Sequence, residues 1–209
     1  MLEQVLYSFV TLLVIIDPVG SAAIFAALTR GAPAAFRRRM AWRGTVIAGI
    51  LILAFAFGGA ALLRALGITL PAFRIAGGVL LFLLAVDMVF ARPSGIRNPT
   101  APEEAEAEHR TDISVFPLAF PLLAGPGAFT SIVLLMGRAT TPLAAAGVIA
   151  ALLAVMLLTL LLLRAAPQVL RLLGVTGANV VSRVLGIILA ALAAQLVLDG
   201  IAEGVLHRT

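Results

Sequence analysis

The sequence contains no cysteine, and only 12% of its 209 residues are charged. The absence of cysteine excludes disulfide bonds and thiolate chemistry. A soluble domain of this length carries about twice that share of charged residues, so this chain has too few polar side chains to cover its apolar surface in water. Hydrophobic residues make up 62% of the chain. The composition therefore indicates a protein embedded in lipid, with the bilayer as its first partner.

Positive charge prevails, but its distribution argues against a nucleic-acid partner. The formal net charge is +5, and the arginines lie mainly in short breaks between apolar runs, where membrane topology requires them. The two histidines, His109 and His207, lie outside those runs, so no intramembrane metal site is expected. A catalytic pair is hard to assemble from such residues, and we expect neither an enzyme nor a bound cofactor.

Six apolar runs mark candidate membrane spans. Each run is near or above the ~20 residues that an α-helix needs to cross a ~30 Å hydrocarbon core. The runs lie at about 4–28, 44–63, 70–91, 113–137, 142–163 and 180–203. The expected fold is all-α: a polytopic membrane protein with six transmembrane helices.

A polar segment at 93–112 separates two halves of three spans each. It holds three prolines followed by four glutamates, a composition typical of a solvated linker. The expected organisation is a first three-helix repeat at 1–92, a cytoplasmic linker at 93–112 and a second three-helix repeat at 113–209.

Matching passages indicate that the two halves repeat one motif. Three pairs recur at nearly the same separation along the chain: residues 63–69 with 170–176, 74–77 with 183–186, and Pro18 with Pro126. Because each half has an odd number of spans, the halves are expected to be inverted relative to each other. Secondary transporters often have this architecture, with the substrate site at the repeat interface.

Arginine is distributed unevenly between the two sides of the predicted membrane. The connections after spans one, three and five carry most of the arginines, whereas the other side carries Arg64, Arg74, Arg138 and Arg208. The positive-inside rule places the arginine-rich connections in the cytoplasm and both termini outside it. The run Arg37-Arg38-Arg39 also suits contact with anionic lipid headgroups.

Asp17 lies near the centre of the first run and is followed by Pro18-Val19-Gly20. A charge at this depth costs ~2.5–3.5 kcal/mol on insertion scales, so water, a solute, a partner or a bound proton has to offset it. Pro18 lacks an N–H group and Gly20 tolerates irregular backbone. We therefore expect two half-helices with Asp17 at their junction. The alternative is a plain kink in which the aspartate only caps backbone N–H groups.

The fourth run has a second interruption at Gly125-Pro126-Gly127. A half-helix that begins here is expected to point the free N–H groups of residues 127–129 into the protein, where they suit an anion such as a carboxylate. The hydroxyls of Thr130 and Ser131 would add polar contacts. The alternative is a kink that serves helix packing alone.

Together, the two interruptions predict a site for a small zwitterionic solute at the middle of the membrane. An ammonium group suits Asp17, and a carboxylate suits the N–H groups. In the alternative, Asp17 carries a coupling proton or a sodium ion. The candidate substrate-binding residues are Asp17, Pro18, Gly20, Ser21, Gly125, Pro126, Gly127, Thr130 and Ser131.

Three passages resemble the MarC-type family of bacterial inner-membrane proteins, also described as the six-helix neutral amino-acid transporter family. They are Ile16-Asp17-Pro18-Val19-Gly20, the run 116–128 (FPLAFPLLAGPGA) and the run 76–82 (AGGVLLF). The resemblance implies six helices, a location in the bacterial cytoplasmic membrane, and transport or export of small neutral amino acids. The chain departs from the family pattern after Gly20, where Asn and then Pro commonly follow and Ser21-Ala22-Ala23 stands here.

The favoured function is a secondary transporter or exporter of a small solute such as glycine, alanine or serine. A small-solute or ion channel is the main alternative, and a non-transporting membrane stress or scaffold protein is another. An ATP-driven pump within this chain is disfavoured because no glycine-rich phosphate loop ending in Lys-Ser or Lys-Thr occurs. The oligomeric state cannot be predicted from the sequence.

Overall fold

The computed structural model describes residues 2–90 and 112–206, which are helical apart from short connections. Five segments are long and apolar enough to cross a membrane, and a bent pair of helices makes a sixth span if the pair is counted as one. The predicted all-α, multi-span fold is thus confirmed. The predicted linker at 93–112 lies outside the described residues except for Asp112, so the division into 1–92, 93–112 and 113–209 stays a prediction.

The first half contains four helices in three spans: α1 (Leu2–Ile16), α2 (Pro18–Leu28), α3 (Ala34–Ala65) and α4 (Leu70–Phe90). Helix α2 begins directly after Asp17 because the aspartate caps its first turn and a proline occupies its first position. Helix α3 starts ten residues before the apolar run predicted at 44–63. Its first turns carry arginines, which hydropathy excludes from a span although they form helix readily.

The second half contains η1 (Ser114–Leu123), α6 (Pro126–Gly137), α7 (Pro142–Arg164) and α8 (Ala166–Leu206). Helices η1 and α6 meet at an angle of 56°. Helix η1 is a π-helix and is wider than an α-helix. The Leu118 N–H donates to the Ile113 carbonyl, five residues earlier instead of four. Two prolines inside η1 lack the N–H groups that an ordinary helix would use.

Helix α8 is longer than the span predicted at 180–203, because it includes a first segment on the other side of a bend. The bend lies at Gly174, whose φ is +66°, in the left-handed region that glycine adopts without steric cost. Gly67, in the turn between α3 and α4, has nearly the same φ of +68°. These two glycines belong to the pair of matching passages at 63–69 and 170–176.

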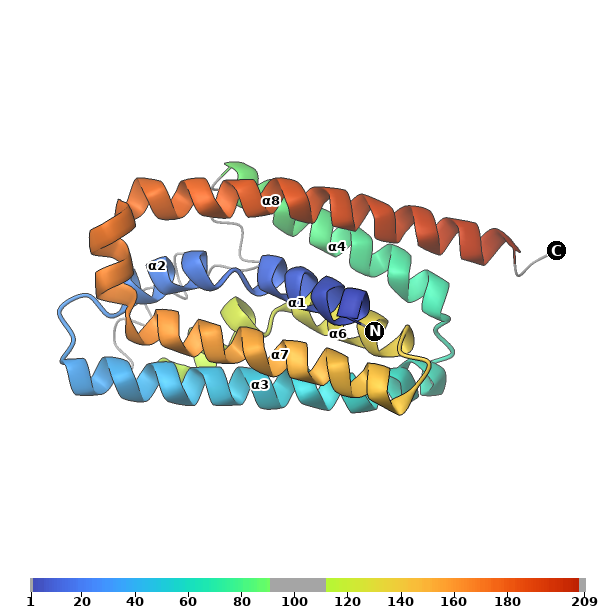
Figure 1. Cartoon of the computed structure of the whole chain (residues 1–209), viewed down its shortest axis with the longest axis horizontal. Coiled ribbons are helices and arrows are strands. Elements are labelled where there is room, and N and C mark those ends of the chain that lie inside the picture. The colour runs from blue at the N-terminus through green and yellow to red at the C-terminus, as the bar shows by residue number, and fades with distance from the viewer. Residues whose placement is uncertain (1, 91–111, 207–209) are drawn as a thin grey trace.

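The helices form an elongated bundle in which α1 begins and α8 ends at the same end (Figure 1). We call this end the terminal end; it also holds the turn between α3 and α4 and the turn between α6 and α7. The opposite end, which we call the arginine end, holds the connection from α2 to α3. Helices α1 and α2 run away from the terminal end, whereas α6 runs towards it (Figure 1).

Helices α4 and α8, one from each half, pack closely along their length. Glycines make this approach achievable: a Cβ atom on Gly78 would lie 2.9 Å from the Ala193 carbonyl oxygen, and one on Gly186 would lie 2.9 Å from Met88 Cβ. Small residues at such positions are typical of helix–helix packing in membranes.

Candidate functional site

Asp17 is fully buried and lies in the break between α1 and α2, and this break is near the middle of the bundle (Figure 1). Its backbone is left-handed, with φ 42° and ψ 73°, and among the described residues it is the one non-glycine with positive φ. Such a conformation is uncommon outside glycine, asparagine and aspartate. The chain therefore maintains an unfavourable backbone geometry at the position of a buried acid.

Both carboxylate oxygens of Asp17 accept hydrogen bonds from protein groups. Oδ1 accepts from the Gly20 N–H at 3.0 Å, which caps α2. Oδ2 accepts from the Ser182 hydroxyl on α8 at 2.7 Å. The capping role that the sequence left open is thus present, and the carboxylate in addition connects the first span to the last helix.

Gly20 has to lack a side chain for this arrangement to form. A Cβ atom at Gly20 would lie 2.2 Å from Asp17 Oδ2 and 2.5 Å from Ser182 Oγ. Ser21, the next candidate residue, is buried and donates its hydroxyl to the Ile16 carbonyl at 2.9 Å. The serine hydroxyl thus supports the last turn of α1 beside the break.

The second interruption lies between η1 and α6, where Gly125 is extended and Pro126 is the first helical residue. A cavity of about 20 Å³ adjoins this break and is lined by Gly125, Pro126, Gly127, Pro121 and Ile15, among others. A cavity of this size has room for about one water molecule. A solute as large as an amino acid would need the surrounding helices to move apart.

The sequence predicted that the N–H groups of residues 127–129, at the start of α6, are all free to bind an anion. The structure differs for two of them. Ala128 and Phe129 both donate to the Gly125 carbonyl, at 3.0 Å and 3.2 Å. Within the described chain, the Gly127 N–H is therefore the one of the three left for another acceptor. The reason is local: the helix closes its first turn at once because Pro126 already has a helical φ.

Thr130 and Ser131 point to different neighbours. The Thr130 methyl group packs on α4, where a Cβ atom at Gly77 would lie 1.8 Å from it, so Thr130 serves helix packing. The Ser131 hydroxyl is buried and, in the part of the chain that the structure describes, has no hydrogen-bond partner. Ser131 lines a separate cavity that is described further below.

The two interruptions approach each other through Ile15. A Cβ atom at Gly127 would lie 3.5 Å from Ile15 Cγ2, so the second break lies beside the last turn of α1. The carboxylate of Asp17, two residues further on, turns towards Gly20 and Ser182 instead. The left-handed backbone at Asp17 accounts for this direction.

Ser182 is the residue that sequence reasoning missed. It lies 165 positions from its partner, and a lone serine beside Arg183 carries no pattern that would single it out. Among the described residues, no group of three or more His, Cys, Asp or Glu side chains lies together in a way that suits a metal ion. The polar groups at the first break include the Asp17 carboxylate, the hydroxyls of Ser21 and Ser182, and the Gly20 N–H.

Comparison with known proteins gives a match along nearly the whole chain. The profile of the MarC family integral membrane proteins matches residues 2–205. A UPF0056 membrane protein of Archaeoglobus fulgidus is 38% identical over 198 residues, which cover 94% of this chain and 91% of the relative. The UPF0056 membrane protein YhcE of Escherichia coli is 33% identical, with 92% and 89% covered.

A third relative, the UPF0056 membrane protein YvbG of Bacillus subtilis, is 30% identical over 201 residues, which cover 96% of this chain and 95% of the relative. No solved structure matches the chain. The matches cover both interruptions and every described helix. The chain therefore belongs to the MarC family of integral membrane proteins.

Proposed function

We propose that the chain is a secondary transporter or exporter of small neutral amino acids, such as glycine, alanine or serine, in the bacterial cytoplasmic membrane. The observation that carries the proposal is the fully buried Asp17 at the interruption of the first span. Acids at this depth are rare and mark solute or ion pathways, because a carboxylate in hydrocarbon needs compensation. A purely structural helix cap would not require an ionisable side chain there, since serine or asparagine would cap as well.

Features that match between the two halves agree with the predicted inverted repeat and support the proposal. Pro18 and Pro126 each begin a half-helix after an interruption, and Gly67 and Gly174 share the left-handed conformation at matching positions. Helix α2 runs away from the terminal end and α6 runs towards it. Transporters built from inverted repeats bind their solutes where the discontinuous helices of the two halves meet.

In the proposed mechanism, Asp17 takes the ammonium group of the solute, and the Gly127 N–H at the start of α6 takes the carboxylate. The alternative role for Asp17 is to carry the coupling ion, a proton or sodium. The cavity of about 20 Å³ beside Gly127 corresponds to a closed state, so the cycle requires α1 and α6 to separate and rejoin.

The orientation proposed for the membrane follows from charge. The arginine end carries the Arg37-Arg38-Arg39 run at the start of α3, and cytoplasmic connections are enriched in arginine. The terminal end, with both chain termini, then faces outward.

A channel and a non-transporting scaffold are the competing functions, and reconstitution separates them. Purified protein in liposomes is tested for uptake of labelled glycine, alanine, serine and leucine, with and without proton and sodium gradients. Saturable uptake with counterflow supports the carrier, whereas conductance far above carrier turnover supports a channel. An enzyme is not proposed.

The Asp17→Asn variant tests the role of the carboxylate, and Glu3→Gln is its matched control because Glu3 is an exposed acid in the same membrane span. We expect uptake to fall at least about tenfold in Asp17→Asn, the scale of one lost charged interaction of about 1.4 kcal/mol, and to stay unchanged in Glu3→Gln. Normal kinetics in Asp17→Asn, with normal membrane insertion, would refute the proposal.

A further inference from the structure

A second cavity lies between α1, α4, α6 and α8, on the terminal side of the interruptions. Its volume is about 20 Å³, and its polar lining consists of Tyr7 and Thr11 from α1, Ser131 from α6 and Arg138, which directly follows α6. Thr11 and Ser131 are 7% and 3% exposed. Thr11 Oγ1 and Ser131 Oγ are two of the three hydroxyls in the described part of the chain that are buried without a hydrogen-bond partner.

Two unpaired hydroxyls in one small cavity point to a bound molecule. Buried polar groups in folded proteins nearly always have partners, and an orphaned hydroxyl indicates a water or ligand. The cavity is large enough for one water, which would have both hydroxyls as neighbours. The same position suits a polar group of a solute, which would have both hydroxyls as donors.

The charge of the lining selects a carboxylate. Among the described residues that line the cavity there is one cation, Arg138, and no acid. Hydroxyl and guanidinium groups all donate hydrogen bonds, and guanidinium matches a carboxylate in shape. An ammonium group would find no anionic partner among these residues.

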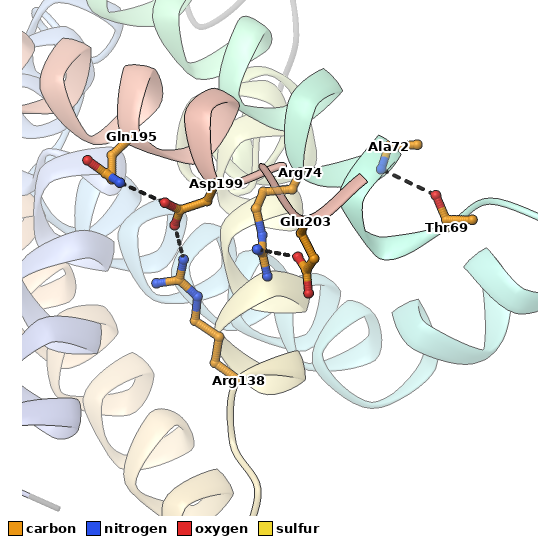
Figure 2. Close-up of polar contacts among 7 residues, drawn as sticks. All are labelled: Thr69, Ala72, Arg74, Arg138, Gln195, Asp199 and Glu203. Atoms are coloured by element: carbon orange, nitrogen blue, oxygen red, sulfur yellow. Dashed lines mark hydrogen bonds and ion pairs between the residues drawn. The ribbon is translucent and has the colours of Figure 1, made fainter. Parts of the chain in front are cut away.

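An internal carboxylate already binds Arg138 from outside the cavity. Arg138 donates to Asp199 of α8 at 2.8 Å, and Gln195 donates to the other oxygen of Asp199 at 2.6 Å. Figure 2 shows these three side chains pointing towards one another between α6 and α8. Asp199 thus occupies the guanidinium that an entering carboxylate would use.

The cavity also borders the second interruption. Ile15 lines both this cavity and the one beside Gly127. Leu81 lines this cavity as well, and its Cδ2 would lie 2.8 Å from a Cβ atom at Gly127. Two apolar side chains therefore separate the two cavities.

We propose that Thr11, Ser131 and Arg138 form an entry site for the carboxylate of a small amino acid, and that Asp199 closes this site by binding Arg138 in its place. The site rests on the proposed transport function and extends it with a second solute position. A solute carboxylate displaces Asp199, binds the guanidinium and the two hydroxyls, and then passes Ile15 and Leu81 towards Gly127.

The absence of native cysteine makes thiol labelling a clean test. The full chain with Ser131→Cys is purified in detergent, where both faces are accessible, and treated with a small anionic methanethiosulfonate. Slow labelling is expected, and Asp199→Asn should accelerate it at least about tenfold by freeing Arg138. Acetate and alanine should each slow the labelling, and methylamine should not.

Thr45→Cys is the matched control. Thr45 is another buried hydroxyl without a partner, but it lies on α3 against α7, away from this cavity. The labelling rate of Thr45→Cys should be the same with and without Asp199→Asn, and with and without acetate. If Ser131→Cys does not fold, Thr11→Cys takes its place. Equal labelling with and without Asp199→Asn, or protection by methylamine alone, overturns the entry site.

The outcome separates the entry site from the transport function. If alanine protects Ser131→Cys but liposomes show no uptake, the entry site is supported and the transport function is rejected. Saturable uptake without any protection retains transport and rejects the site. Where acetate protects Ser131→Cys, the additional Arg138→Gln change should abolish that protection.

Discussion

The Ser182 hydroxyl lies 2.7 Å from Asp17 Oδ2 and joins the last helix of the chain to the interruption in its first span. The bond connects α8 of the second half to the junction between α1 and α2 of the first. Because Asp17 is buried and Ser182 is half-buried, this bond constrains where the carboxyl group lies. Ser182 is thus a positioning residue for Asp17.

Replacement of Ser182 should impair transport through Asp17. In Ser182→Ala we expect uptake to fall about three- to tenfold because the carboxylate loses one of its donors. Ser182→Thr retains the hydroxyl and should keep uptake near the wild-type rate. If Ser182 only filled space, retention of the hydroxyl would not matter. Measurement is by uptake into liposomes of both variants at matched protein content; wild-type rates in Ser182→Ala would contradict the role.

Gly20 and Gly58 offer a matched pair of glycine-to-alanine changes. A methyl group at Gly20 would lie within 2.2 Å of Asp17 Oδ2, whereas nothing lies within 4 Å of a Cβ atom at Gly58. We expect Gly20→Ala to lose about 1–3 kcal/mol of stability through overpacking, and Gly58→Ala to be neutral or slightly stabilising. Thermal unfolding in detergent compares the two, and equal melting temperatures would show that the site relaxes around the methyl group.

Asp112 should give the arginine end a pH-dependent contact. The Ser114 hydroxyl and N–H donate to Asp112, and the positive charges of Arg43 and Arg39 add to them, so the pKa of this carboxyl lies below its usual 3.8. A carboxyl with a depressed pKa in the folded chain stabilises it above the unfolded pKa, and that contribution is lost as the pH falls through the folded value.

The Asp112→Asn variant measures this contribution. The difference in melting temperature between wild type and Asp112→Asn should be constant from about pH 5 to pH 7, since the carboxyl is ionised there. It should shrink below about pH 4. A difference that does not change down to pH 3 would show that the contact does not depend on ionisation.

Single cysteines can determine the orientation of the chain in the membrane. Thr140 lies in the exposed turn between α6 and α7 at the terminal end, and Ala35 lies exposed at the start of α3 at the arginine end. We expect an impermeant thiol reagent added to intact cells to label Thr140→Cys and to leave Ala35→Cys unlabelled until the cells are opened. The reverse pattern would invert the proposed topology.

The membrane spans could be predicted from the sequence because a helix in lipid must satisfy its own backbone hydrogen bonds, so a long apolar run has few alternatives. The start of α2 could be predicted as well, since Asp17 and Pro18 are adjacent and act locally. Hydropathy predicts the part of a helix that lies in lipid, and it does not predict where the helix ends. Helices α3 and α8 accordingly extend well beyond their predicted runs.

The partners within the site could not be predicted in the same way. The bond from Ser182 to Asp17 depends on how α8 packs against α2. The residues next to Ser182 and Asp17 in the sequence contain no pattern that predicts this bond. The cavity with Thr11 and Ser131 combines residues of four helices. Such contacts are properties of the packed bundle, because a serine or threonine in an apolar run reads the same whether its hydroxyl is paired with its own backbone or not.

The close glycine packing of α4 on α8 has a mechanical consequence. The backbones approach so closely at Gly78 and Gly186 that an added Cβ atom would clash with the neighbouring helix, and close packing of this kind resists sliding of one helix past the other. In the proposed transport cycle we therefore expect α4 and α8 to move together, and the discontinuous helices α1, α2, η1 and α6 to move relative to them.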